Sequence, residues 1–111
     1  MDQGTRAGNY IETSASCMFV YALAKGARLG YLDKKYAPVA RKGYDGIVKQ
    51  FVKTEPAGLL SLTGTVSVGG LGGSPYRDGS YEYYLSEPLK TNDFKGVGPF
   101  IMAGIEVEQL R

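Results

Sequence analysis

One apolar run, residues 15–24, constrains the fold more than any other part of the chain. It reads ASCMFVYALA and lies inside a segment, 11–29, that is typical of a helix, with Gly30 placed to end it. The run is apolar on every side, and a helix that is apolar all round is buried all round. That is hard to arrange in a chain of 111 residues, which has few other helices to surround this one.

Two further helices are expected. The segment 37–53 carries Pro38 in its first turn, where a missing N–H costs nothing, and its apolar residues form one stripe opposite a charged face. This pattern indicates an outer helix with one side in water, joined to the first helix by a short connection. A last helix is expected to open at Gly98-Pro99 and to run to about Leu110, again with nearly apolar first turns.

The region between the second of these helices and the last one differs from them in composition. After a turn at 55–58, the short runs 59–62 and 65–68 flank Thr63-Gly64 and predict a small β-hairpin. Six glycines then fall within residues 64–79, which indicates a long Gly-rich loop. The sequence therefore predicts a mainly α fold of about three main helices with a small hairpin and this loop.

Composition excludes several chemistries within this chain. It contains no histidine and one cysteine, Cys17, so histidine-based catalysis, histidine metal ligation and intramolecular disulfides are excluded. Cys17 lies in the apolar run and is expected to be an inert buried thiol. The 13 basic and 11 acidic residues include no basic block with interleaved aromatics, so we expect no nucleic-acid partner. The run 15–24 is about half of a ~20-residue membrane span, so we expect no membrane partner either.

Two motifs that suggest nucleotide binding or serine catalysis do not meet the requirements of either function. The glycines of 69–73 do not form a nucleotide-binding loop, because Pro75 stands where a third glycine is needed and no helix start follows. Ser14 and Ser16 lack both a histidine and a Ser-x-x-Lys lysine to activate them. We interpret them as first-turn residues that satisfy free backbone N–H groups.

The stretch 75–84 has the most functional character, with four tyrosines, Arg77 and two carboxylates beside the Gly-rich loop. Tyrosine faces stack on sugar rings, and arginine with aspartate can hold hydroxyl or carboxylate groups. Equally, Arg77 and Asp78 can form a loop salt bridge while the tyrosines cover the ends of apolar helices. Composition alone favours neither interpretation.

Several strings, taken together and in order, resemble one family. They are DQG at 2–4, GNYIETSASCMFVYALAKG at 8–26, GLGG at 70–73, RDGSYEYYLSEP at 77–88, and ND at 92–93 with GVGPF at 96–100. The chain resembles the C-terminal third of the unsaturated rhamnogalacturonyl hydrolases of glycoside hydrolase family 105. The unsaturated glucuronyl hydrolases of family 88 share that fold and a weaker version of the strings.

The resemblance implies an (α/α)6 barrel, of which residues 1–111 would be one partial domain. The helices 11–29 and 99–110 would be inner helices and 37–53 an outer one, with the loops 4–12 and 69–98 at the barrel mouth. The family hydrates the C4=C5 double bond of unsaturated uronic acids by means of an aspartate. That aspartate has no counterpart in these residues, so we expect no catalytic residue here.

Site residues carried over from the resemblance are candidates for lining the substrate end, without an assigned contact. They are Tyr10, Glu12, Ser14, Arg77, Asp78 and Tyr81. We expect no metal and no cofactor, and an unsaturated uronide oligosaccharide as substrate of the complete enzyme. The resemblance implies a protein of the bacterial cytoplasm or periplasm. A full family member has roughly three times this length, so we expect a fragment that is inactive alone.

A second hypothesis is a non-catalytic module that self-associates or binds sugar. Two helices that are apolar all round would expose a large patch in so small a chain, which predicts a homo-oligomer or association with the missing part of the barrel. The absence of tryptophan counts mildly against a pure sugar-binding module.

Overall fold

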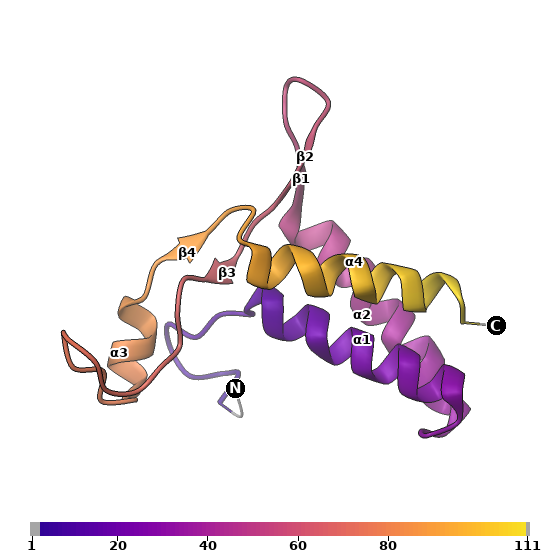
Figure 1. Ribbon diagram of the computed structural model, residues 1–111, viewed down its shortest axis with the longest axis horizontal. Helices are drawn as coiled ribbons and strands as arrows, with labels where there is room; N and C mark the ends of the chain where they lie inside the picture. The colour runs from indigo at the N-terminus through magenta and orange to yellow at the C-terminus, as the bar shows by residue number, and fades with distance from the viewer. Residues whose placement is uncertain (1–2, 111) are drawn as a thin grey trace.

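The structure is a computed structural model that describes residues 3–110 (Figure 1). These residues form four α-helices: α1 (Thr13–Leu29), α2 (Ala37–Phe51), α3 (Tyr81–Ser86) and α4 (Phe94–Glu108). A short 3-10 helix (Lys34–Tyr36) precedes α2. The strands are β1 (Val52–Thr54), β2 (Leu60–Leu62), β3 (Thr65–Val66) and β4 (Leu89–Lys90). The prediction of a mainly α fold with a small β-hairpin is confirmed.

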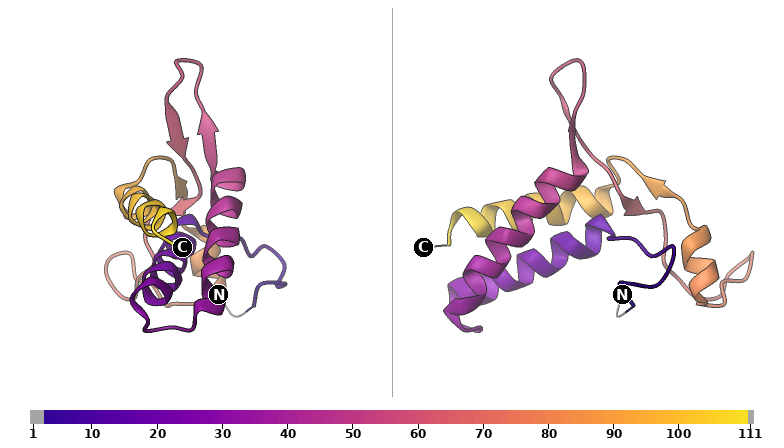
Figure 2. Two further views of the ribbon diagram at one scale, coloured as in Figure 1. Left: turned by 90° about the vertical axis from the view of Figure 1, so that its right-hand side faces the viewer. Right: turned by 180° about the vertical axis from the view of Figure 1, so that it is seen from behind.

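The three long helices form the body of the molecule. Helices α1 and α4 run side by side, and α2 packs against both of them (Figures 1 and 2). Small side chains let the helices approach closely, because Cys17, Ala24, Ala40 and Ala103 are all completely buried where the helices meet. Burial raises the pKa of Cys17 to about 11, as expected for an inert thiol.

Helix α1 begins at Thr13, two residues later than predicted, because the Glu12 side chain caps it by accepting the Ala15 N–H. The two serines do not cap the helix, which corrects their interpretation as residues that satisfy free N–H groups. Ser14 Oγ donates to the Glu12 carboxylate and Ser16 Oγ donates to the Glu12 carbonyl oxygen. The predicted end is confirmed by Gly30, which adopts φ 79°.

The prediction that α1 is buried all round is not met within residues 3–110. The arc facing α2 and α4 is buried, but Met18 is 50% exposed and Phe19 is 60% exposed. Helix α4 behaves in the same way, with Ile101 and Ile105 on its open side at 55% and 51%. Both helices therefore present apolar side chains away from the body of the chain.

The other two helix predictions need smaller corrections. Helix α2 has Pro38 in its first turn as expected, but ends at Phe51 rather than Lys53 because Val52 is extended and begins β1. Helix α4 begins at Phe94, ahead of the predicted start at Gly98-Pro99. The Asp93 side chain caps it by accepting the Lys95 N–H, and Pro99 lies inside the helix.

The predicted hairpin is wrong in its pairing. Strand β1 pairs with β2 across the turn at 55–58, and β3 pairs with β4 much later in the chain. Thr63 and Gly64 do not turn the chain back, because their backbone groups bond elsewhere: Thr63 N–H donates to the Phe51 carbonyl and the Gly64 carbonyl accepts the Thr13 N–H. The β1–β2 hairpin projects from the helices (Figure 2).

A second lobe, formed by the loop 69–79 and α3, lies beyond the N-terminal end of α1 (Figure 1). The loop is closed by two backbone hydrogen bonds between Gly72 and Arg77. The lobe contacts the N-terminal segment through Tyr81 of α3, whose hydroxyl donates to the Ala7 carbonyl at 3.0 Å and whose ring lies under the Arg6 guanidinium. The lobe and the N-terminal segment thus meet near the start of α1.

Candidate functional site

Three adjoining hollows lie at the N-terminal end of α1 and between the N-terminal segment and α3. The first, here called the α1–β3 hollow, is about 390 Å³ and lies between the start of α1, residues 66–69 and Lys95. The second, the Tyr10 hollow, is about 280 Å³ and lies between residues 9–12 and the first turns of α1. The third, the Tyr81 hollow, is about 410 Å³ and lies between the N-terminal segment and α3. Tyr84 borders all three hollows, so they form one neighbourhood.

The Glu12 side chain connects the residues that separate the α1–β3 hollow from the Tyr10 hollow. Its buried carboxylate accepts the Ala15 N–H at 2.7 Å, the Ser14 hydroxyl at 2.8 and 2.9 Å, and the Val66 N–H at 2.9 Å. These bonds join the cap of α1 to strand β3, although residues 12 and 66 are far apart in the chain. Glu12 therefore positions the backbone and the Ser14 hydroxyl beside the α1–β3 hollow.

Tyr10 and Tyr84 stack face to face, with ring centroids 5.4 Å apart and planes 7° from parallel. The Tyr10 hydroxyl oxygen is buried and has no hydrogen-bond partner among residues 3–110. Burial raises the pKa of Tyr10 well above its usual range, and the neighbouring Tyr84 adds to this. The two rings form an aromatic wall of the Tyr10 hollow, and Tyr84 also borders the α1–β3 hollow.

Lys95 supplies a cation at the edge of the α1–β3 hollow. Its Nζ lies 2.8 Å from both carboxylate oxygens of Asp93, the cap of α4. This contact is the main cause of the lowered pKa of Asp93. The Lys95 side chain remains about half exposed, so a ligand in the hollow can reach it.

Arg77 and Asp78 lie outside the three hollows, in the closed loop. The salt bridge between them, one of the two interpretations of this stretch, is not formed. Arg77 Nε is instead 3.8 Å from Glu87 Oε1, and Asp78 Oδ1 accepts the Ser80 N–H at 2.9 Å. The Ser80 contacts hold the pKa of Asp78 below its usual value, so this residue is a turn-forming carboxylate.

The structure thus groups the six sequence candidates unequally. Tyr10, Glu12 and Ser14 lie together at the start of α1. Tyr81 lines the neighbouring Tyr81 hollow, whereas Arg77 and Asp78 line none of the three hollows. Sequence reasoning missed Tyr84 and Lys95 as lining residues. Tyr84 stood within the tyrosine-rich stretch that was singled out, whereas no local signal marked Lys95.

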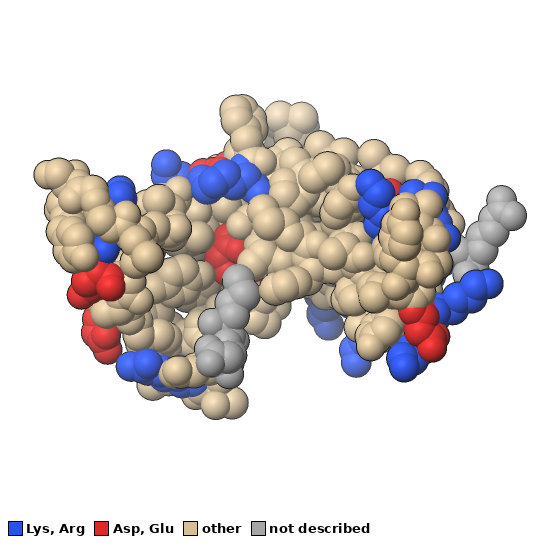
Figure 3. Space-filling model, turned by 60° about the horizontal axis from the view of Figure 1, so that its bottom comes forward, with Lys and Arg blue, Asp and Glu red and all other residues tan. Residues whose placement is uncertain are grey.

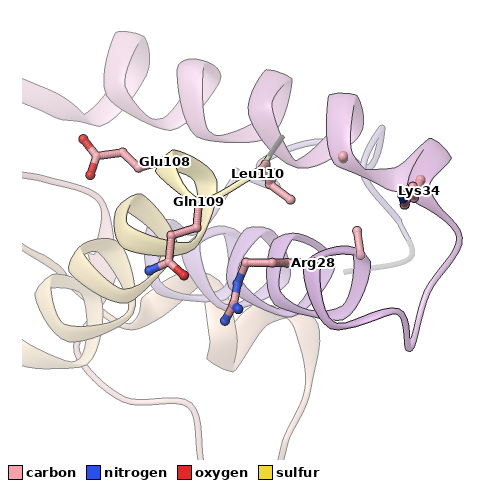
Figure 4. Close-up of a pocket in the computed structure, with 7 residues that line it drawn as sticks. Arg28, Lys34, Glu108, Gln109 and Leu110 are labelled. Carbon is pink, nitrogen blue, oxygen red and sulfur yellow. The ribbon is translucent and has the colours of Figure 1, made fainter.

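A fourth hollow, about 520 Å³, lies at the opposite end of the helices and is lined in part by Arg28, Lys34 and Gln109 (Figure 4). Glu108 points away from Arg28 in this view. The Arg28 guanidinium is paired with the buried Glu106 carboxylate at 2.6 Å, and no aromatic side chain lines this hollow. The end of the molecule that carries tyrosines and the buried Glu12 is the better candidate site.

The charges do not indicate a polyanion partner. Lys and Arg residues are scattered over the face shown in Figure 3 rather than gathered into one patch. Within residues 3–110, no cluster of three or more His, Cys, Asp or Glu side chains could hold a metal ion. No helix in the described part of the chain is long and apolar enough to cross a membrane.

Comparison with known proteins places this chain in a class, the glycoside hydrolases. The family model described as Glycosyl Hydrolase Family 88 matches residues 1–111, and the chain belongs to this family. The chain is also similar to a solved glycoside hydrolase of family 105 from C. acetobutylicum ATCC 824, with 48% identity and a TM-score of 0.94. The prediction of a fragment of an (α/α) barrel glycoside hydrolase fold is confirmed by this match.

Two curated relatives are 46% identical over 112 residues: Protein Atu3128 of Agrobacterium fabrum and the 24.9 kDa protein in picA locus of Rhizobium radiobacter. The match takes in 96% of this chain and 48% of each relative. The match to the solved enzyme covers 98% of this chain and 30% of the enzyme's chain. The chain therefore spans about half the length of the curated relatives and less of the solved one.

Proposed function

We propose that this chain forms part of the substrate-binding end of a glycoside hydrolase that hydrates the C4=C5 bond of unsaturated uronides from rhamnogalacturonan. In that reaction water adds across the double bond, the sugar ring opens and the glycosidic bond is lost. The observation that carries the proposal is the grouping of Tyr10, Tyr84, Glu12 and Ser14 around adjoining hollows in a chain that matches glycoside hydrolase family 88 along its whole length.

The α1–β3 hollow and the Tyr10 hollow have the chemistry that a sugar ring needs. The Tyr10–Tyr84 wall offers an apolar face on which a ring can stack. The Ser14 hydroxyl donates to Glu12, which leaves its oxygen free to accept a bond from a sugar hydroxyl. Lys95 offers a positive charge to a uronate carboxylate.

The acidic candidates here are poorly suited to general acid–base chemistry. A general acid must hold its proton near the working pH, yet the pKa of Asp78 is lowered and its carboxylate is committed to the turn before α3. The Glu12 carboxylate is fully used by its bonds to α1 and β3. We therefore propose that the acid–base aspartate is supplied from outside these 111 residues, and that residues 1–111 are one part of a larger domain.

The first test is an assay that follows the loss of ultraviolet absorbance from an unsaturated rhamnogalacturonan disaccharide. The 111-residue chain should give no turnover, while saturation transfer should still detect contact between the sugar and tyrosine rings. Replacing Tyr84→Ala should weaken sugar binding about tenfold, because one aromatic contact contributes about 1 kcal/mol or slightly more.

The matched control is Tyr76→Ala. Tyr76 is 79% exposed in the loop 69–79 and lines none of the three hollows. Turnover by the isolated chain, or equal losses from both substitutions, would contradict the proposal.

A further inference from the structure

The junction between α3 and β4 carries a shielded carboxylate, that of Glu87, which lines none of the three hollows (Figure 1). The Glu87 side chain is only 15% exposed, although it stands at the end of a six-residue helix. Shielding a charge from water is costly unless hydrogen bonds or opposite charges replace the water. The partners that do so for Glu87 come from three different segments of the chain.

The first partner is Ser67, directly after β3. Ser67 Oγ donates to Glu87 Oε2 at 3.1 Å, and the Ser67 N–H donates to the Pro88 carbonyl at 2.9 Å. Residues 66–69 form one wall of the α1–β3 hollow. Glu12 accepts the N–H of the first residue in this wall, so two carboxylates from distant parts of the chain hold adjacent wall residues.

The second partner is Tyr83, one turn earlier on α3. Its hydroxyl is hydrogen-bonded to the Glu87 carboxylate, and the hydroxyl oxygen also accepts the Gly70 N–H at 3.4 Å. Partial burial raises the pKa of Tyr83, and the bond to Glu87 raises it further. Because Gly70 directly follows the wall 66–69, this contact connects Glu87 to the far end of that wall.

The third partner is Arg77, a sequence candidate that lines none of the three hollows. Its backbone closes the Gly-rich loop through hydrogen bonds of 2.8 and 3.0 Å with Gly72. Its Nε lies 3.8 Å from Glu87 Oε1, and a Cβ added at Gly73 would lie only 2.9 Å from its Nη1. The Arg77 side chain therefore connects the closed loop to the end of α3.

We propose that Glu87 is a positioning residue for the candidate site: through its three partners it fixes the wall 66–69 and the Gly-rich loop, without touching the sugar itself. The inference rests on the proposed function, because it concerns the geometry in which the α1–β3 hollow holds a sugar ring. It also gives Arg77 a role, since this residue carries the hold of Glu87 into the loop.

The test compares nitrogen-15 amide spectra of the 111-residue chain and of Glu87→Ala. The signals of Ser67 and Gly70 should shift, and both amides should exchange with solvent about tenfold faster because their segment loses an anchoring hydrogen bond. Amides of α1 and α4 should exchange as in the wild type. Titration with the unsaturated rhamnogalacturonan disaccharide should show an affinity about fivefold lower.

Two further variants separate positioning from general stability. Glu87→Gln keeps an oxygen that accepts the Ser67 hydroxyl, so it should restore most of the affinity and leave a loss of about twofold. Tyr83→Phe keeps the ring and removes the hydroxyl between Glu87 and Gly70. Its effect on affinity should not add to that of Glu87→Ala in the double variant, because both substitutions break one network.

The matched control is Glu82→Ala in the same helix, α3. The Glu82 side chain is 77% exposed, pairs with Arg6 and lines none of the three hollows. It should leave the Ser67 and Gly70 signals and the affinity unchanged. The proposal is overturned if Glu87→Ala leaves those signals in place, if exchange accelerates throughout α1 and α4 without rescue by Glu87→Gln, or if the control causes equal losses.

The two proposals fail in different ways. A wild-type chain that binds no disaccharide would contradict the proposed function, while the Ser67 and Gly70 signals would still decide whether Glu87 fixes the wall. Disaccharide binding that Glu87→Ala leaves unchanged would retain the proposed function and reject Glu87 as a positioning residue.

Discussion

Arg28 in the last turn of α1 and Glu106 near the end of α4 form a bidentate ion pair. Arg28 Nε donates to Glu106 Oε2 at 2.6 Å and Nη2 donates to Oε1 at 3.0 Å. The Glu106 side chain is 9% exposed and that of Arg28 is 30% exposed. Because paired, charge-assisted bonds fix both distance and orientation, this contact sets how the two helices lie at their far ends.

Breaking this pair should destabilise the chain. In Glu106→Gln, the Arg28 guanidinium loses its carboxylate while the shape of the side chain is kept, so the midpoint of urea unfolding should fall clearly. The comparison is Glu82→Gln, which breaks the exposed Arg6–Glu82 pair at 3.4 Å and should have little effect. Equal effects would show that the α1–α4 pair contributes no more than a surface contact.

The same pair predicts a pH dependence. Arg28 lowers the pKa of Glu106 from its ordinary value of 4.5. A carboxyl with a lower pKa in the folded state adds stability above about pH 4.5, and this contribution is lost as the pH falls through the folded value. Urea midpoints should therefore fall below pH 4.5 in the wild type and fall less steeply in Glu106→Gln. Parallel curves would contradict this assignment.

Gly96 in α4 has no room for a side chain, because a Cβ there would collide with Thr65 Oγ1. Gly96→Ala should lower the free energy of unfolding by about 1–3 kcal/mol. Gly98→Ala is the control in the same helix, since a Cβ at Gly98 meets nothing within 4 Å, and it should stabilise by up to about 1 kcal/mol. Adding Thr65→Ala to Gly96→Ala should restore part of the loss, and no recovery would mean that another contact is responsible.

Glu12 should stabilise both α1 and β3. Glu12→Ala removes the α1 cap and the acceptor for Val66 N–H, and should cost about 1–2 kcal/mol with faster amide exchange at Ala15 and Val66. Asp93→Ala removes the cap of α4 and should leave the exchange of those two amides unchanged. If both substitutions accelerated Val66 exchange alike, the change would reflect global unfolding rather than the Glu12 bond.

Helix positions were predictable because they follow from local patterns. The stripe of α2 with Pro38 in its first turn, and the stop at Gly30, are signals within a few residues of one another. The strand pairing was not predictable in this way. Asn92 exchanges hydrogen bonds with the backbone of Leu62, and β3 pairs with β4 across more than twenty residues, so the partners are distant in sequence.

The site was predictable only in part, for the same reason. Tyr10, Glu12 and Ser14 are neighbours in sequence and remain neighbours in space. Lys95 joins them because α4 packs beside α1, a relationship that no pattern around residue 95 encodes. The cap formed by Glu12 was also unexpected, because serine is the more common cap and two serines stood nearby.

The proposed substrate end can be tested most directly by titrating the nitrogen-15-labelled chain with an unsaturated rhamnogalacturonan disaccharide and following backbone amide signals. The account predicts shifts at Ser14, at Val66 to Gly69 and at Lys95, which border the α1–β3 hollow. Signals from Ala27 and Gln109, at the opposite end of the helices, should not move. An absence of shifts at the start of α1, or shifts confined to that opposite end, would contradict it.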